Sequence, residues 1–253
     1  MRQVDLSVVV AAYNEAKRIE QTLQHISAFL DTFHGNVEII VVDDGSTDET
    51  ASVVLRLVRT SLRSVRLVRF ERNHGKGAAL RAGVAASGGK RVLVTDADLS
   101  TPIEDLKVLT LAMDAGAHVA VGSRAVPSSR IRRSQPALRV FLGQAGNRWI
   151  RMLAVPGVRD TQCGFKLFEG QVARWLFSQA REQRFSIDVE VLCLARRLGL
   201  TIVEVGVTWR HEDDSKVRWW DYLDVLVSVP RIAWHSVATA RRRGVLFKPV
   251  KVE

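Results

Sequence analysis

The first half of the chain alternates short β-branched stretches with stretches whose apolar residues recur every three or four positions. The strand-like stretches have the length and composition of buried parallel strands, and polar turn residues separate them from the helical ones. Short links between alternating strands and helices predict a doubly wound, mostly parallel α/β sheet. The expected strands are residues 6–12, 37–42, 65–70, 91–95 and 118–123, and the expected helices cover the apolar positions within residues 19–33, 51–58, 78–86 and 103–115.

The second half of the sequence is less regular. Residues 127–136 are polar and rich in arginine, so we expect a mobile loop there. Residues 160–166 should form a compact turn, and residues 201–209 form the last expected strand. Helical patterning predicts helices over residues 137–153, 172–179 and 187–198.

Two carboxylates, Asp96 and Asp98, directly follow the strand expected over residues 91–95. Open α/β sheets bind ligands outside the carboxyl ends of their strands, and two aspartates at this spacing can reach one hard cation. Aspartate is also common in solvated turns, so the pair alone is a weak signal. Polar residues end two further strands, at Tyr13-Asn-Glu15 and Asp43-Asp44, and parallel strands would bring all three ends to one edge.

Composition narrows the class of protein. The 253 residues, 47% hydrophobic and 25% charged, suit one large or two small globular domains. Cys163 and Cys193 are too few for a disulfide framework, and the sequence has neither a signal-peptide pattern nor an apolar run of about 18 residues. We therefore expect the protein in the cytosol. Its net charge of +10 favours anionic partners: nucleic acid, anionic lipid or phosphorylated substrates.

Several nucleotide-binding patterns are missing. No Gly-x-Gly-x-x-Gly follows the first strand, no P-loop motif occurs, and the glycines at 75, 77 and 83 have the wrong spacing. Nothing resembles a recognition helix or an aromatic stacking motif for nucleic acid, so we expect no nucleic-acid partner.

Seven short motifs nevertheless occur in a recognisable order, and with them the chain resembles family 2 glycosyltransferases of the GT-A fold. Within that family it is similar to the polyprenyl- or dolichyl-phosphate hexose synthases, the glucosyl- and mannosyltransferase branch. The resemblance covers about residues 6–218 and implies a GT-A, Rossmann-like domain over 1–218, with 219–253 as an amphipathic basic segment. The motifs are Ala11-Ala-Tyr-Asn-Glu15, Val42-Asp-Asp-Gly-Ser-Thr-Asp48, Asn73-His-Gly-Lys-Gly77, Asp96-Ala-Asp98, Gly122-Ser-Arg124, Asp160-Thr-Gln-Cys-Gly-Phe-Lys166 and Phe185-Ser-Ile-Asp-Val-Glu190.

The resemblance implies roles for the matched residues. Asp96 and Asp98 would bind Mg²⁺ or Mn²⁺ and the donor diphosphate, and Asp188, the third residue expected to be catalytic, would lie beside the transferred sugar. Arg124 and Arg139 would meet the acceptor phosphate. The expected nucleotide-sugar contacts are Ala12, Tyr13, Glu15, Asp43, Asp44, Lys76 (near the base or ribose), Asp96, Ala97 and Lys216 (near the phosphates). The donor nucleotide, UDP or GDP, stays open. Ser100 stands where some mannosyl members have a metal-binding Gln, which weakens the case for a third metal ligand and for mannose; the hexose, glucose or mannose, stays open.

The expected acceptor needs charge neutralisation rather than a base. A lipid monophosphate is largely dianionic at neutral pH, because its second pKa is near ~6. Two unit charges 4 Å apart interact by roughly 4 kcal/mol at an effective dielectric of about 20, so cations must offset the repulsion between donor and acceptor. We expect an inverting hexosyltransferase that uses polyprenyl phosphate. The alternative is a transferase of the same fold with a hydroxyl acceptor, for which Asp188 would act as the base.

The C-terminal segment carries a helical stripe that includes two tryptophans and ends in basic residues. A helix of this kind is typical of the lipid headgroup region, although such a stripe also suits a helix packed on the core. Pro230 should kink this segment or start a second helix. We expect peripheral attachment to an anionic cytoplasmic membrane face. The stripe consists of Trp219, Tyr222, Leu223, Leu226, Pro230, Ala233, Trp234 and Val237.

Overall fold

The computed structural model describes residues 3–60, 64–133, 146–210 and 219–241. Its main sheet has seven strands in the order β3-β2-β1-β4-β7-β5-β8, and a small second sheet pairs β6 with β9. All neighbours in the main sheet are parallel except the two that flank β7. The strands are β1 (Leu6–Ala12), β2 (Val37–Asp43), β3 (Val65–Arg69), β4 (Arg91–Asp96), β5 (Val119–Ser123), β6 (Arg130–Arg133), β7 (Lys166–Glu169), β8 (Ile202–Gly206) and β9 (Thr208–Arg210).

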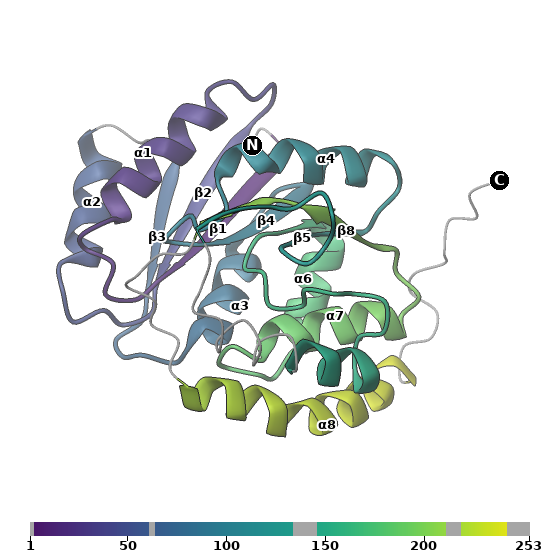
Figure 1. Cartoon of the computed structure of the whole chain (residues 1–253). Coiled ribbons are helices and arrows are strands. Elements are labelled where there is room, and N and C mark those ends of the chain that lie inside the picture. Colours follow the sequence, from purple (N-terminus) through teal and green to yellow (C-terminus); the bar gives the residue numbers. More distant parts are fainter. Residues whose placement is uncertain (1–2, 61–63, 134–145, 211–218, 242–253) are drawn as a thin grey trace.

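Helices cover both faces of the sheet (Figure 1). One face packs against α1, α2 and α4, and the other against α3, α6 and α7, with α8 lying outside α7. Residues 146–153 are also helical. The named helices are α1 (Ile19–Leu30), α2 (Thr50–Thr60), α3 (Lys76–Ala86), η1 (Ile103–Asp105), α4 (Leu106–Asp114), α6 (Gly170–Gln179), α7 (Ile187–Arg197) and α8 (Trp219–Arg241).

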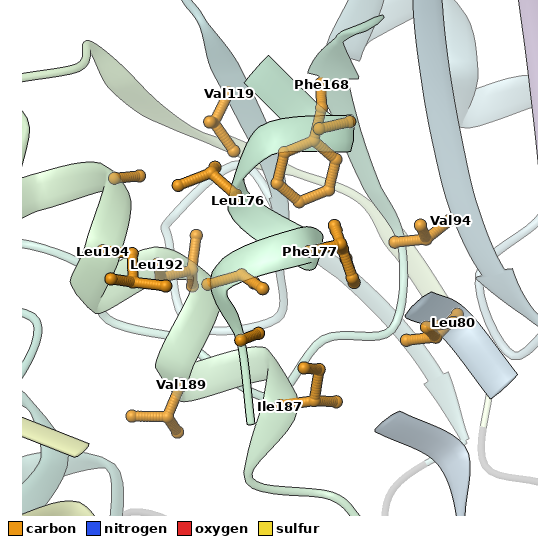
Figure 2. Packing of buried hydrophobic residues seen from close by; sticks show 14 of the residues in the cluster. Leu80, Val94, Val119, Phe168, Leu176, Phe177, Ile187, Val189, Leu192 and Leu194 are labelled. Carbon is orange, nitrogen blue, oxygen red and sulfur yellow. The ribbon is translucent and has the colours of Figure 1, made fainter. Parts of the chain in front are cut away.

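Continuous apolar strands explain this three-layer arrangement. In β1, Val8 and Val10 point into the core on the α1 side, while Val9 points into the core on the α3 side. Each is fully buried, and burial of such a side chain stabilises the fold by about 1.5–3 kcal/mol. Figure 2 shows how Phe168 and Phe177 pack together on the face covered by α3, α6 and α7. Their rings are arranged edge to face, with the ring centroids 5.6 Å apart. The predicted α/β fold class is confirmed.

The sequence interpretation was wrong at several points. The strand expected over 201–209 is two strands, β8 and β9, and the expected loop over 127–136 contains β6, which pairs with β9. The short strand β7 was missed altogether. Leu55 is one of the apolar positions of the helix expected over residues 51–58, but it is exposed, because Val53 and Leu57 face the core instead.

Helix α8 runs through Pro230 as one helix, so of the two alternatives predicted for Pro230, a kink or a second helix, the second helix does not form. Among the α8 side chains that the structure describes, the buried ones are Ser228, Val229, Ile232 and Ser236, on the side that packs toward α7, whereas Trp234 from the predicted stripe is exposed. No helix within the described ranges is long and apolar enough to cross a bilayer. The boundary expected at residue 218 falls outside the described residues.

Candidate active site

Three neighbouring parallel strands end together at one edge of the sheet. Strand β1 lies between β2 and β4, with Ala12 opposite Asp43 and Ala11 opposite Asp96. The carboxyl ends of β1, β2 and β4 therefore bring the predicted polar groups to one place. This is the edge at which open α/β sheets bind ligands.

The first two strand ends are tied to each other. Asn14 adopts a left-handed backbone conformation (φ 55°), which asparagine tolerates better than most residues, and its Oδ1 accepts a hydrogen bond from Thr47 N at 2.9 Å. Ser46 Oγ accepts from Asn14 N, and Thr50 Oγ1 accepts from Glu15 N. These bonds fix the segment that carries Tyr13 and Glu15 against the end of β2.

Asp43 and Asp44 have different surroundings. The Asp43 carboxylate is fully buried; Oδ1 accepts from Ser46 N, whereas Oδ2 accepts no hydrogen bond from the described residues and lies 3.3 Å from Arg69 Nε. Asp44 accepts bonds from the backbone N–H groups of His74 and Gly75 and thereby holds the loop before α3. Burial outweighs these bonds, so the pKa of Asp44 is raised. Asp43 thus keeps one carboxylate oxygen that is ion-paired with Arg69 but accepts no hydrogen bond within the described residues, while Asp44 shapes the loop.

Asp96 and Asp98 lie at the end of β4 and interact unfavourably with each other. Burial, together with the negative charge of Asp96, raises the pKa of Asp98, even though Asp98 Oδ1 accepts a hydrogen bond from Ser100 N. The next residue, Leu99, has a positive φ of 45°, a strained conformation for leucine. Strain and like-charge repulsion at one place indicate a site kept for function rather than for stability.

A third segment, the turn before β7, lies directly against the Asp96 carboxylate. Gly164, in the turn before β7, lies so close that an added Cβ would stand 2.0 Å from Asp96 Oδ2. Only glycine fits at this position while the Asp96 carboxylate stays where it is. The turn over 160–166 was predicted; its contact with Asp96 was not.

The Lys76 side chain links Asp96 to Asp188, and a second lysine, Lys166, supports Asp188. Lys76, the first residue of α3, places Nζ 2.7 Å from Asp96 Oδ1 and 3.6 Å from Asp188 Oδ2. Behind it, the fully buried Lys166 donates to Asp188 and to the carbonyl of Cys163. Burial alone would raise the pKa of Asp188, but the charges of Lys166 and Lys76 outweigh it and hold that pKa below its ordinary value.

Arg124 is held by the buried Asp160. Its backbone N, Nε and Nη2 all donate to the Asp160 carboxylate at 2.7–2.9 Å, a bidentate arrangement, and its guanidinium also stacks over Trp209 at 5.5 Å. Burial opposes ionisation, but the Arg124 charge keeps the pKa of Asp160 low. The pair fixes the direction of a guanidinium that remains 28% exposed.

The structure brings most of the predicted residues together. Ala12 and Ala97 are buried beside the strand ends, where the Ala12 carbonyl accepts from Asp44 N and the Ala97 carbonyl from Thr22 Oγ1. Arg139 and Lys216 lie outside the described residues, so their predicted roles remain predictions. Lys166 was missed as a site residue; the signals for it are its place at the end of the motif over residues 160–166 and its position between Phe165 and Leu167 in an apolar strand.

Comparison with known proteins agrees with this geometry. The fold and the polar edge define a glycosyltransferase of the GT-A fold. The model named Glycosyl transferase family 2 matches residues 7–174, and the chain belongs to that family. The predicted family, fold and enzyme class are therefore confirmed.

Similar sequences carry a common description. Dolichyl-phosphate β-glucosyltransferase of Drosophila melanogaster is 37% identical over 235 residues, which cover 88% of this chain and 72% of that protein. The Homo sapiens protein of the same name is 34% identical over 233 residues, covering 87% of this chain and 72% of that protein. Glucosyltransferases rather than mannosyltransferases are thus favoured.

Solved structures share the fold. Glucosyl-3-phosphoglycerate synthase from Mycobacterium tuberculosis, in complex with Mn²⁺, UDP-glucose and phosphoglyceric acid, has a TM-score of 0.66 at 24% identity, covering 93% of this chain and 80% of that one. Mannosyl-3-phosphoglycerate synthase from Rubrobacter xylanophilus has a TM-score of 0.66 at 18% identity, covering 99% and 79%.

Proposed function

We propose that this enzyme transfers glucose from UDP-glucose to a dolichyl-type polyprenyl phosphate, with inversion at the sugar. The observation that carries the proposal is the arrangement at the carboxyl edge, where a carboxylate pair, Asp96 and Asp98, lies with two directed cations, Lys76 and Arg124. Such a set suits the meeting of two phosphate-bearing substrates. The names of the similar sequences support glucose and dolichyl phosphate.

The nucleoside would lie at the ends of β1 and β2. Asp43 Oδ2, buried and without a hydrogen bond in the described part of the chain, can accept from a base N–H. Tyr13 and Glu15 lie on the segment fixed beside it, within reach of the base and ribose. The UDP-glucose complex of the mycobacterial synthase supports uridine over guanosine.

Asp96 and Asp98 fit a divalent cation. Their oxygen ligands suit Mg²⁺ or Mn²⁺, and their mutual repulsion is what a cation would relieve. Among the residues that the structure describes, no three His, Cys, Asp or Glu side chains form a metal cluster, so the donor diphosphate and water would complete the coordination. When bound, the ion supplies positive charge for the departing diphosphate. The Mn²⁺ complex of the mycobacterial synthase supports this role.

The acceptor phosphate needs no general base. One of its oxygens forms the new bond to the sugar C1 as the bond from C1 to the UDP oxygen breaks on the opposite face, which inverts the configuration. Arg124, held in direction by Asp160, would bind the phosphate. Asp188 is unsuited to the role of base, because Lys166 and Lys76 hold its pKa low and its side chain is only 4% exposed.

A panel of acceptors separates this proposal from the alternative with a hydroxyl acceptor. We expect glucose transfer from UDP-glucose to short polyprenyl phosphate, at a rate that is level above about pH 7, where the phosphate is dianionic. Polyprenol and simple sugars should not accept glucose from UDP-glucose. Transfer to a sugar hydroxyl, with none to the lipid phosphate, would overturn the proposal.

A double variant can separate the proposed role of Arg124 in acceptor binding from its contribution to stability. Arg124→Met alone should lower the free energy of unfolding by about 3 kcal/mol, because it leaves Asp160 buried without its main partner. In the double variant Arg124→Met/Asp160→Asn, much of this stability should return, but KM for the lipid phosphate should stay raised by about tenfold or more. Recovery of a normal KM in the double variant would remove Arg124 from the acceptor site.

We also propose that the enzyme works as a peripheral protein on the cytoplasmic face of a membrane. Two helical segments that contact the same core cluster expose apolar side chains: Val227 and Trp234 on α8, and Trp149 and Met152 in residues 146–153. Arg148 and Arg151 are exposed next to the latter pair. Apolar side chains mixed with basic ones suit a surface that lies in anionic headgroups.

Removal of all residues after Ala240 tests the basic end of this segment. The deletion removes Arg241, Arg242, Arg243, Lys248 and Lys251, each worth about 1 kcal/mol near an anionic leaflet. Co-sedimentation with anionic liposomes should fall sharply, and salt should weaken wild-type binding. Trp234→Ala should reduce binding to neutral and anionic liposomes alike. Binding that neither the deletion nor salt changes would contradict the proposed basic contact.

A further inference from the structure

Lys76 occupies an unusual position for a lysine. It begins α3, where the positive end of the helix dipole disfavours a cation, and its side chain is only 15% exposed. Two carboxylates compensate: Asp96 at 2.7 Å and Asp188 at 3.6 Å. The ammonium group therefore pairs closely with Asp96 and, at a longer distance, with Asp188.

The second carboxylate is held in place from behind. Asp188 accepts a hydrogen bond from Lys166, which is itself fixed by the Cys163 carbonyl, and both charged side chains are buried. A buried pair of this kind is seldom the most stable choice for a core. Asp188 consequently presents a charged, immobile oxygen toward Lys76.

The first carboxylate is the one that the proposed function assigns to the divalent cation. An ammonium group and a divalent ion at Asp96 would repel each other, so Lys76 would shift away from Asp96 when the ion is bound. A movement on the order of 1 Å would shorten the existing ion pair of Lys76 with Asp188 from 3.6 Å to hydrogen-bond distance. The second carboxylate thus lies where the displaced ammonium group needs it.

On the basis of the proposed function, we propose that Lys76 is the resident counter-cation of Asp96 and moves to Asp188 when metal and donor bind. The site has a net charge of −1, from three carboxylates (Asp96, Asp98 and Asp188) and two ammonium groups (Lys76 and Lys166). A divalent ion that binds without the donor would turn this net charge positive. An ion that arrives with the donor diphosphate leaves no such excess. Lys76 therefore disfavours metal binding before the donor and couples the two binding events.

The test measures the affinity of nucleotide-free protein for Mn²⁺, with electron paramagnetic resonance as the readout of binding. Lys76→Met should bind Mn²⁺ at least about tenfold more tightly than wild type, because one nearby positive charge is gone. With saturating UDP, the ratio of the Mn²⁺ affinity of Lys76→Met to that of wild type should shrink toward one or fall below one, because Lys76 also attracts the diphosphate. Lys76→Arg, which keeps the charge, should stay close to wild type.

A matched control removes the same charge elsewhere. Lys90 forms a 2.8 Å ion pair with Asp5 at the opposite end of the sheet and is well exposed. Lys90→Met should leave Mn²⁺ affinity unchanged in both conditions. A gain equal to that of Lys76→Met would mean that net charge alone sets the affinity, which would overturn the proposal.

A second variant tests the position at Asp188. Lys166→Met/Asp188→Asn removes both members of the buried pair, so no uncompensated charge remains, and thermal unfolding checks that the protein folds. Without the second carboxylate, Lys76 should hold Asp96 more firmly, and nucleotide-free Mn²⁺ affinity should fall below that of wild type. Unchanged or tighter binding would overturn the role of Asp188.

The outcomes separate this inference from the proposed function. Equal nucleotide-free affinity in wild type and Lys76→Met, with normal Mn²⁺ binding alongside UDP, would overturn the role of Lys76 and leave the metal site standing. Failure of both proteins to bind Mn²⁺ even with UDP would overturn the metal site and this inference together.

Discussion

Replacement of Asp98 by Asn should reduce transfer by about a thousandfold or more without unfolding the protein. Loss of a cation ligand removes several kcal/mol of charge stabilisation from the transition state, and each 1.36 kcal/mol is about tenfold in rate. Burial and the neighbouring Asp96 raise the pKa of Asp98, so the fold disfavours its charged form. Removal of that charge should therefore keep or increase the free energy of unfolding at neutral pH.

Asp105 supplies a control for the same chemical change. Its pKa is also raised, chiefly by burial, and its carboxylate accepts a hydrogen bond from Thr208 N at the start of β9. Asp105→Asn should keep transfer within a few-fold of wild type. Full activity of Asp98→Asn, or full wild-type activity in excess EDTA, would contradict the metal assignment.

Gly164→Ala should cost about a hundredfold in kcat, although it adds only one methyl group. The new Cβ would stand 2.0 Å from Asp96 Oδ2, so the carboxylate must swing away from its place between the turn and Lys76. Misplacement of a catalytic group by about 1 Å can cost on the order of a hundredfold. The effect on stability should be small, because the displaced group is a partly exposed side chain.

Gly88→Ala is the matched substitution. A Cβ there would meet only Glu38 and Val4 side-chain atoms, at 3.7 and 3.9 Å, which is ordinary contact. Its kcat should equal that of wild type. If Gly164→Ala kept full activity, or lost activity only through unfolding in a thermal melt, the position assigned to Asp96 would be wrong.

The central strands could be predicted from the sequence because their signal is local. Strands β1, β2 and β4 are continuous apolar runs that end in acidic or polar turns, and parallel neighbours necessarily end at one edge. Asp43, Asp96 and Asp98 are predicted in this way from the sequence alone. Strand β7 gave no such signal, because it has four residues and enters the sheet antiparallel directly after a turn.

The ion pairs of the site could not be predicted, because each joins segments far apart in the chain. Asp160 was considered a turn residue, and nothing in its spacing from Arg124 indicates a bidentate pair. Lys76 was expected near the base or ribose, yet its nearest carboxylate is Asp96. Such contacts depend on how α3, α7 and β7 pack on the sheet, which local patterns do not encode.

The most direct test of the central claim is the anomeric configuration of the glucose in the lipid product. The purified chain, supplied with UDP-glucose, Mn²⁺ and dolichyl phosphate, should form a glucosyl phospholipid whose sugar is β-linked by NMR, since the donor is an α-glucoside and attack occurs opposite the leaving diphosphate. An α-linked product, or release of free glucose with no lipid product, would contradict the account.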